Sequence, residues 1–380
     1  MSKPGRLFFA VSLLFGTWAY AQQCAPAAGA AAQNQATPPN PVLEHRPPPK
    51  APAKSSAVAA EGRINLDVLV SDAAGKPVFG LDPWDLKVLD DGQQRKILSF
   101  RSYDGVAARP DPPVQVILLI DTVNLPLQQV AFTRQEIARF LRQNGGHLAQ
   151  PVSIFLLTDA GLRMQPRPST DGNALASIVQ QIKASVHTIN AAMGAEGDLM
   201  RFQLSVRQIS AIAENEALRP GRKLLIWVGP GWPMLDSDKF TYSDKDQRRY
   251  FDGIVELSTK LRQARMAVYS VSASSSGLGA SPERSFLYQG FLKGVKSPRQ
   301  ADTGNLALKV LVTQSGGRIL GPDNDLAAQI DSCIAEANAF YTLSFDPPPA
   351  AHPDEYHDLK VQLYKPGLTA RTSTGYYNQP

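Results

Sequence analysis

The chain has 380 residues, and its 43% hydrophobic and 19% charged content is typical of a globular protein, which excludes a disordered or fibrous chain. The formal net charge is +5, and removal of the two N-terminal charges Lys3 and Arg6, which we expect, leaves +3. So small an excess does not indicate a nucleic-acid partner. The length favours two folded units and a tail.

Residues 1–21 have the pattern of a secretory signal peptide. Lys3 and Arg6 provide the positive start, residues 7–18 are apolar, and residues 19–21 (Ala-Tyr-Ala) fit the small-x-small cleavage pattern. The apolar stretch is short for a bilayer span, so an uncleaved membrane anchor is the less favoured alternative. We therefore expect an exported protein, periplasmic or secreted, that meets a membrane only through export or peripheral association.

Residues 22–62 are rich in Ala and Pro, and we interpret them as a tether. Their proline clusters at residues 38–41 and 47–49 are incompatible with a helix or a central strand and favour a semi-extended spacer. Cys24 lies in this segment, and Cys333 lies on an expected helix. Export permits a disulfide between the two, but a buried Cys333 beside a free tail thiol is an equal alternative.

A small β unit is expected over residues 63–105, as the N-terminal half of a β-sandwich. Its first strand shows the period-2 alternation of a half-buried strand. The alternating apolar residues are Ile64, Leu66, Val68 and Val70. Residues 72–77 then form a turn, and Leu86 and Val88 lead into Asp91-Gly92. Because Asp and Gly tolerate the positive φ of a tight turn, this pattern predicts a hairpin.

Residues 112–338 have a different rhythm, in which apolar strands alternate with helices. Four runs are almost continuously apolar, as expected for strands covered on both faces of a parallel sheet. They are residues 114–120, 152–157, 224–228 and 266–271. The turn at residues 159–161 predicts a short antiparallel edge strand at Leu162 and Met164. Helical spacing is found near residues 130–141, 174–182, 202–213, 251–261, 306–312 and 326–337, with a short strand expected at residues 318–320.

This alternation predicts an α/β domain with a doubly wound, mostly parallel, Rossmann-like sheet. Period-2 alternation returns in residues 339–380, for example at Tyr341 and Leu343 and again at Leu359 and Val361. Neither the early nor the late strands are numerous enough to bury a core alone. We therefore expect residues 339–380 to be the C-terminal half of the sandwich, with the α/β domain inserted between the two halves.

The order of these elements resembles the von Willebrand factor type A (VWFA) fold, and more narrowly the acidobacterial VWFA-related proteins. The resemblance covers residues 64–377 and rests on short motifs in a fixed order. The motifs are residues 116–124, residues 228–233 (Val-Gly-Pro-Gly-Trp-Pro), residues 247–252, residues 316–318, residues 364–368 and residues 375–377. The resemblance implies a binding module, because many type A domains hold Mg²⁺ at the carboxyl ends of the strands and a ligand carboxylate completes its coordination.

The resemblance also implies a metal pattern that this chain keeps only in part. The family pattern Asp-x-Ser-x-Ser begins at Asp121, but Val123 and Leu125 stand where oxygen donors are required. Gly229 stands where a further acid belongs. Neutral oxygens bind Mg²⁺ poorly without carboxylates, so we expect a degenerate site and no cofactor, with residual Mg²⁺ binding as the alternative.

The remaining ligand candidates are Asp121, Asn124 and Thr170, with Ser169 and Asp171 beside the last of them. An explanation without metal is available for each position. A carboxylate at a strand end can cap the backbone N–H groups that follow it. Thr170 and Asp171 likewise suit the start of the helix that follows.

Trp232 is the residue that we expect to face a protein partner, because exposed aromatic side chains are favoured at interfaces. The alternative is an indole folded down over the next helix. The sequence contains no Gly-x-Ser-x-Gly elbow, His-Glu-x-x-His helix or P-loop, and Asp90-Asp91 lies at an expected turn, where solvation is the default. We therefore expect neither an enzyme nor a small-molecule substrate.

These observations favour an exported, non-catalytic protein-binding or adhesion-type module that uses the top face of the α/β domain to hold an unidentified protein partner. The alternative is a Mg²⁺-dependent ligand receptor with a residual metal-ion-dependent adhesion site at Asp121.

Overall fold

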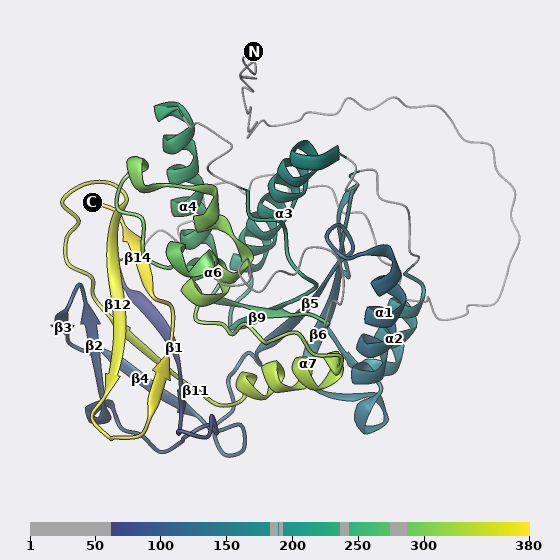
Figure 1. The fold of residues 1–380 in the computed structure, drawn as a ribbon. Coiled ribbons are helices and arrows are strands. Elements are labelled where there is room, and N and C mark those ends of the chain that lie inside the picture. The colour runs from purple at the N-terminus through teal and green to yellow at the C-terminus, as the bar shows by residue number, and fades with distance from the viewer. Residues whose placement is uncertain (1–61, 183–188, 190–192, 236–242, 274–286) are drawn as a thin grey trace, which may run out of the picture. The chain divides into compact units, whose positions relative to one another are not determined.

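The computed structural model describes residues 62–182, 189, 193–235, 243–273 and 287–380, and over these residues it shows a mixed α/β protein with three sheets (Figure 1). The six-stranded sheet has the order β10-β9-β5-β6-β7, with β8 also paired to β6. Its strands β10, β9, β5 and β6 are parallel, so the sheet is mostly parallel. The expected signal peptide and nearly all of the expected tether lie outside the described residues.

The strands of the mostly parallel sheet are β5 (Gln115–Asp121), β6 (His147–Thr158), β7 (Gly161–Met164), β8 (Ser169–Asp171), β9 (Lys223–Val228) and β10 (Met266–Val271). Every residue of β5, β9 and β10 is buried, as expected for strands covered on both faces. The four apolar runs predicted to be strands are therefore confirmed, and so is the antiparallel strand β7. We call the edge where β5, β9 and β10 end the carboxyl edge.

Helices lie on both faces of this sheet. They are α1 (Leu127–Leu141), α2 (Gly172–Gln180), α3 (Gly194–Ala217), α4 (Asp244–Gln263), α6 (Leu308–Gln314) and α7 (Leu326–Ile334). Val116, Leu118 and Ile120 of β5 share a core with residues of α1, α2 and α7. Because side chains alternate along a strand, Asp121 points to the opposite face of the sheet. Helices α3, α4 and α6 lie on that side of the sheet (Figure 1).

Two four-stranded antiparallel sheets enclose a second core. Their strands are β1 (Ile64–Ser71), β2 (Leu86–Asp90), β3 (Gln93–Arg95), β4 (Ser99–Tyr103), β11 (Phe340–Phe345), β12 (Glu355–Leu363), β13 (Thr369–Arg371) and β14 (Gly375–Asn378). The strand orders are β13-β1-β11-β4 and β14-β12-β2-β3, so strands that precede the parallel sheet in the chain pair with strands that follow it. Leu66, Val88, Leu343 and Val361 belong to one shared core.

The hairpin between β2 and β3 has the predicted turn, because Asp91 and Gly92 adopt φ angles of 47° and 78°. Two other expectations need correction. The strand expected at residues 318–320 is only an isolated bridge between Ile319 and Ser270. The helix expected over residues 306–312 begins later, as α6, because Ala307 has an extended backbone between a 3₁₀ turn and α6.

Ionic and aromatic contacts join the antiparallel sheets to the parallel one. Arg371 of β13 donates to Oε2 of Glu336 at 2.6 Å and to the carbonyl oxygen of Gly316 at 2.7 Å. Arg222, just before β9, donates to the carbonyl oxygen of Glu336 at 2.8 Å, and its guanidinium lies 4.6 Å from the ring centre of Phe340. These contacts fix the two cores against each other. Among the described residues, no helix is long and apolar enough to cross a membrane.

Candidate functional site

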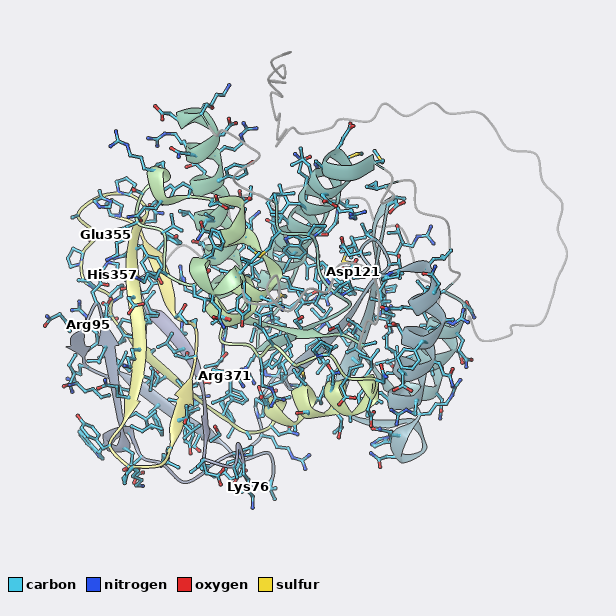
Figure 2. All side chains as sticks on the ribbon, viewed as in Figure 1. Lys76, Arg95, Asp121, Glu355, His357 and Arg371 are labelled. Carbon is cyan, nitrogen blue, oxygen red and sulfur yellow. The ribbon has the colours of Figure 1, made fainter. Side chains whose placement is uncertain are left out.

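Asp121 is the last residue of β5, a central strand between β9 and β6, and it lies at the carboxyl edge (Figure 2). This position was expected from the apolar run that precedes it. The side chain has no solvent exposure. A carboxylate in this position of an open α/β sheet lies where ligands normally bind, so its partners decide what the edge can do.

Both carboxylate oxygens of Asp121 accept hydrogen bonds from the protein. Oδ1 accepts from the backbone N–H groups of Val123 (3.2 Å) and Asn124 (3.0 Å) and from Nδ2 of Asn124 (3.1 Å). Oδ2 accepts from the same Nδ2 (2.9 Å) and from Nε1 of Trp227 (2.9 Å). The structure thus shows the backbone capping that we expected of this carboxylate.

All of these donors are electrically neutral. Burial raises the pKa of the Asp121 carboxyl above its usual value, and the hydrogen bonds from Asn124 and Trp227 oppose that rise. The carboxylate is thus held by amide, backbone and indole N–H groups in an environment without solvent.

Trp227 reaches Asp121 from the neighbouring strand. Strands β5 and β9 pair with Leu119 beside Trp227. Because side chains alternate along both strands, Trp227 and Asp121 lie on the same face of the sheet. The indole of Trp227 is fully buried. Its ring meets that of Trp232 edge-on, with 5.1 Å between the ring centres and 75° between the planes.

Trp232 does not form the exposed anchor that we expected. It is 5% exposed, and its Nε1 donates to the carbonyl oxygen of Leu306 at 3.1 Å. The residue therefore packs down between Trp227 and the 3₁₀ turn Thr303–Leu306, so the indole is folded down as in the alternative, but onto this turn and not onto the next helix, α4. The physical reason is that an indole gains both apolar contact and a hydrogen-bond acceptor in this position.

Thr170 does not join Asp121 and Asn124. Ser169 of β8 pairs with Val152 near the start of β6, whereas Asp121 is level with Leu157 near its end. Five residues of strand separate these levels, which is about 16 Å. Thr170 is exposed, and its neighbour Asp171 caps α2 by accepting from the N–H of Ala174 at 3.0 Å. The predicted three-residue metal group is therefore not assembled.

The other positions of the family's metal pattern are also filled without oxygen donors. Val123 and Leu125 are 3% and 4% exposed, so both side chains are buried. Gly229 has a φ of 148°, and a Cβ atom there would lie 3.0 Å from Cβ of Asp121. Any side chain at this position would be strained. With the carboxylate oxygens already facing N–H donors, the residues present do not fit a divalent cation at Asp121.

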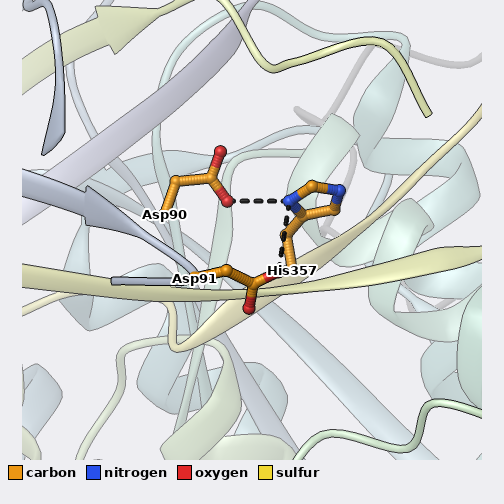
Figure 3. A group of neighbouring side chains, drawn as sticks. All are labelled: Asp90, Asp91 and His357. Carbon is orange, nitrogen blue, oxygen red and sulfur yellow. Dashed lines mark hydrogen bonds and ion pairs between the residues drawn. The ribbon is translucent and has the colours of Figure 1, made fainter. Parts of the chain in front are cut away.

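A second group of acidic residues lies in the antiparallel sheets (Figure 3). Within the described residues, Asp90, Asp91 and His357 have ligand atoms within 4.8 Å of one another. Nδ1 of His357 lies 2.8 Å from Oδ1 of Asp90 and 3.6 Å from Oδ2 of Asp91. Asp90 is fully buried, whereas the Asp91 side chain is 42% exposed.

The remaining contacts of Asp90 indicate a structural role for this group. Oδ2 of Asp90 accepts from Nε of Arg95 at 2.9 Å and from the hydroxyl of Tyr376 at 3.2 Å. The ring of Tyr376 stacks on His357 with 4.9 Å between the ring centres. A guanidinium already bonded to the carboxylate opposes a second cation there. Burial and Asp90 together raise the pKa of the Tyr376 hydroxyl, which keeps it a hydrogen-bond donor.

The sequence carries a signal for Asp90 and a weaker one for Trp227. Asp90 continues the inward alternation of Leu86 and Val88, so burial and not solvation was the better expectation. Trp227 is the last residue but one of β9, which is a fully buried run like β5, but its contact with Asp121 depends on β9 lying beside β5. Cys333 is buried and forms no disulfide with a described residue, and Cys24 lies outside the described residues, so a disulfide between the two stays a prediction.

No family model and no curated protein sequence matches the chain. Solved structures that it resembles include the human COPII-coat protein Sec24c, with a TM-score of 0.31 and 9% identity over 70% of this chain and 44% of that chain. The pilus adhesin SpaC from Lactobacillus rhamnosus GG has a TM-score of 0.36 and 11% identity over 79% of this chain and 43% of that chain. The chain thus spans less than half the length of either structure. At these TM-scores the likeness supports no conclusion about function.

Proposed function

We propose that this protein is an exported, non-catalytic protein-binding module of the VWFA-like type. In this proposal the α/β domain is inserted between the two halves of a β-sandwich, and the carboxyl edge receives a protein partner. The observation that carries the proposal is the state of Asp121. It occupies the position of a metal-holding carboxylate, yet Asn124 and Trp227 occupy both of its oxygens. Recognition there does not require a cation.

The connections at the carboxyl edge support a role in recognition. Residues 122–126 follow β5, residues 229–243 connect β9 to α4, and the connection after β10 begins at residue 272. All three start at the same edge because the strands are parallel. In folds with a rigid sheet, binding residues are disproportionately found in connections of this kind.

The alternative function, a Mg²⁺-dependent receptor, is supported by one residue, Asp121, and opposed by its hydrogen bonds. Thr170, another ligand candidate that such a receptor would require, lies about 16 Å away along the strands. The buried Val123 and Leu125 offer no oxygen. We therefore favour the metal-independent function.

Affinity purification tests the proposed function. The mature protein, residues 22–380, serves as bait for proteins of its own cell envelope, with and without EDTA. The test variant replaces residues 236–242, in the connection after β9, with a Gly/Ser segment of equal length. The matched control is Leu218→Ser, since Leu218 is 67% exposed and lies between the end of α3 and the start of β9, at the opposite edge.

We expect a partner that remains bound in EDTA, binds the Leu218→Ser control and is lost with the replaced segment. A partner that is released by EDTA would instead favour the Mg²⁺-dependent receptor. Equal capture by both variants would place the binding surface elsewhere and contradict the assignment to the carboxyl edge. Export is checked separately, because cleavage after Ala21 predicts a secreted form whose mass corresponds to a start at Gln22.

A further inference from the structure

The buried network around Asp121 connects four parts of the fold. Asn124 donates to Asp121 and also to the hydroxyl of Ser205 on α3, at 3.2 Å. Trp227 donates to Asp121 from β9. Trp232 packs on Trp227 and donates to the carbonyl oxygen of Leu306. The carboxylate is therefore at the centre of a hydrogen-bonded and aromatic network that joins the sheet, helix α3 and two connections.

The indole N–H of Trp227, which donates to Oδ2 of Asp121, determines whether a cation can bind this oxygen. An indole Nε1 carries a hydrogen and has no lone pair to offer a metal. At 2.9 Å from Oδ2 and with no exposed surface, the Trp227 ring fills the space beside that oxygen. A cation on Oδ2 would have to displace the ring, which is held in turn by Trp232. On Oδ1, two backbone N–H groups fix the chain that follows β5.

We propose that the indole N–H of Trp227 has permanently taken the role of a cation at Asp121, so that Trp227 is the residue that excludes divalent metals from the carboxyl edge. The lack of side-chain oxygens at Val123 and Leu125 lowers the affinity for a divalent cation, but the Trp227 indole is what prevents its binding. The inference concerns the edge assigned above to a partner, yet it stands or falls independently, because cation binding is measured on the protein alone.

Calorimetric titration of the mature full-length protein with Mn²⁺ tests the inference. The variant Val123→Ser/Leu125→Ser restores two oxygen donors and keeps the indole. A triple variant adds Trp227→Phe, which removes the N–H and part of the ring. We expect no saturable Mn²⁺ binding by the wild type or the double variant. The triple variant should bind Mn²⁺ saturably, at least about tenfold more tightly than the lower limit that the titration sets on the dissociation constant of the double variant, and adding Asp121→Asn should abolish that binding.

Three results would overturn the inference. Saturable binding by the wild type that disappears with Asp121→Asn would show that the indole admits a cation. Equal binding by the double and triple variants would show that only the oxygens were missing. A triple variant that is folded by circular dichroism yet binds no Mn²⁺ would show that the indole was not the barrier.

The wild type gives a second measurement that does not depend on folding of the triple variant. The Nε1–H proton of Trp227 can be followed by NMR during addition of Mg²⁺. We expect a resonance protected from exchange with solvent and unmoved by Mg²⁺, because the proton is held on Oδ2 of Asp121. A saturable shift of this resonance with Mg²⁺ would overturn the inference directly.

Discussion

Two fully buried carboxylates, Asp121 at the carboxyl edge and Asp90 in the antiparallel sheets, are stabilised in different ways. Asp121 is surrounded by neutral donors, of which the indole of Trp227 is one. Asp90 is bonded to the guanidinium of Arg95 and also to His357 and Tyr376. A buried carboxylate can therefore be satisfied without a cation. The charge of its partners decides how much the free energy of unfolding falls when the contact is lost.

The largest change in the free energy of unfolding is expected at Asp90, whose partner Arg95 is charged. Asp90→Ala leaves Arg95, Tyr376 and His357 without their shared acceptor, and we expect a loss of about 3–5 kcal/mol in the free energy of unfolding. Urea denaturation measures it. The matched control is Asp91→Asn, whose side chain is 42% exposed and which keeps an acceptor for the N–H of Asp358. A control that is as destabilising as Asp90→Ala would contradict the central role of Asp90.

A smaller change in the free energy of unfolding is expected at Asp121, whose hydrogen-bond donors are neutral. Trp227→Phe removes one hydrogen bond to Asp121 and leaves Oδ2 with Asn124 as its remaining donor. We expect a loss of about 1–3 kcal/mol in the free energy of unfolding. The control Trp84→Phe should change it by no more than about 0.5 kcal/mol, since Trp84 is 87% exposed. If both substitutions have the same effect, the indole does not stabilise the carboxylate.

The smallest effect is expected in the pH dependence. Burial raises the pKa of Asp121 in the folded protein, so the folded chain holds this proton more tightly than the unfolded chain. The associated stability is complete below the unfolded pKa, near 4, and is lost as the pH rises through the folded pKa. Asp121→Asn has no such proton. The free energy of unfolding of the wild type, minus that of the variant, should therefore grow as the pH falls from about 7 to about 4.

The expected growth is about 1.4 kcal/mol for each pH unit by which the folded pKa exceeds the unfolded one. Urea denaturation of both proteins at several pH values measures it. A difference that stays constant over this range would mean that the hydrogen bonds from Asn124 and Trp227 fully offset the burial of the carboxyl.

Local patterns were sufficient to predict the four parallel strands of the α/β sheet and the position of Asp121. A continuous apolar run such as residues 115–120 has few alternatives to a covered strand, and the residue that ends it must lie at the carboxyl edge of a parallel sheet. The hairpin at Asp91 and Gly92 was predictable for a similar reason, since the two residues tolerate the φ angles that the turn requires.

Contacts between distant residues were not predictable in this way. Trp227 meets Asp121 because β9 lies beside β5, and no local pattern states which strands are neighbours. Thr170 was assigned to the wrong end of the sheet because β8, whose existence the sequence did not indicate, carries it back to the start of β6. The burial of Trp232 depends on the carbonyl oxygen of Leu306, far along the chain.

The pairing of β1 with β11 has a consequence for how the chain reaches its native state. Ile64 pairs with Phe345 and Val68 with Tyr341, so β1 has neither of its neighbouring strands until the chain has been made as far as β11 and β13. High contact order of this kind slows folding and prolongs the exposure of unpaired edges. Loss of the last forty or so residues would leave β1 and β2 without their partner strands β11 and β12. We expect such a truncated chain to aggregate rather than to leave an intact α/β core.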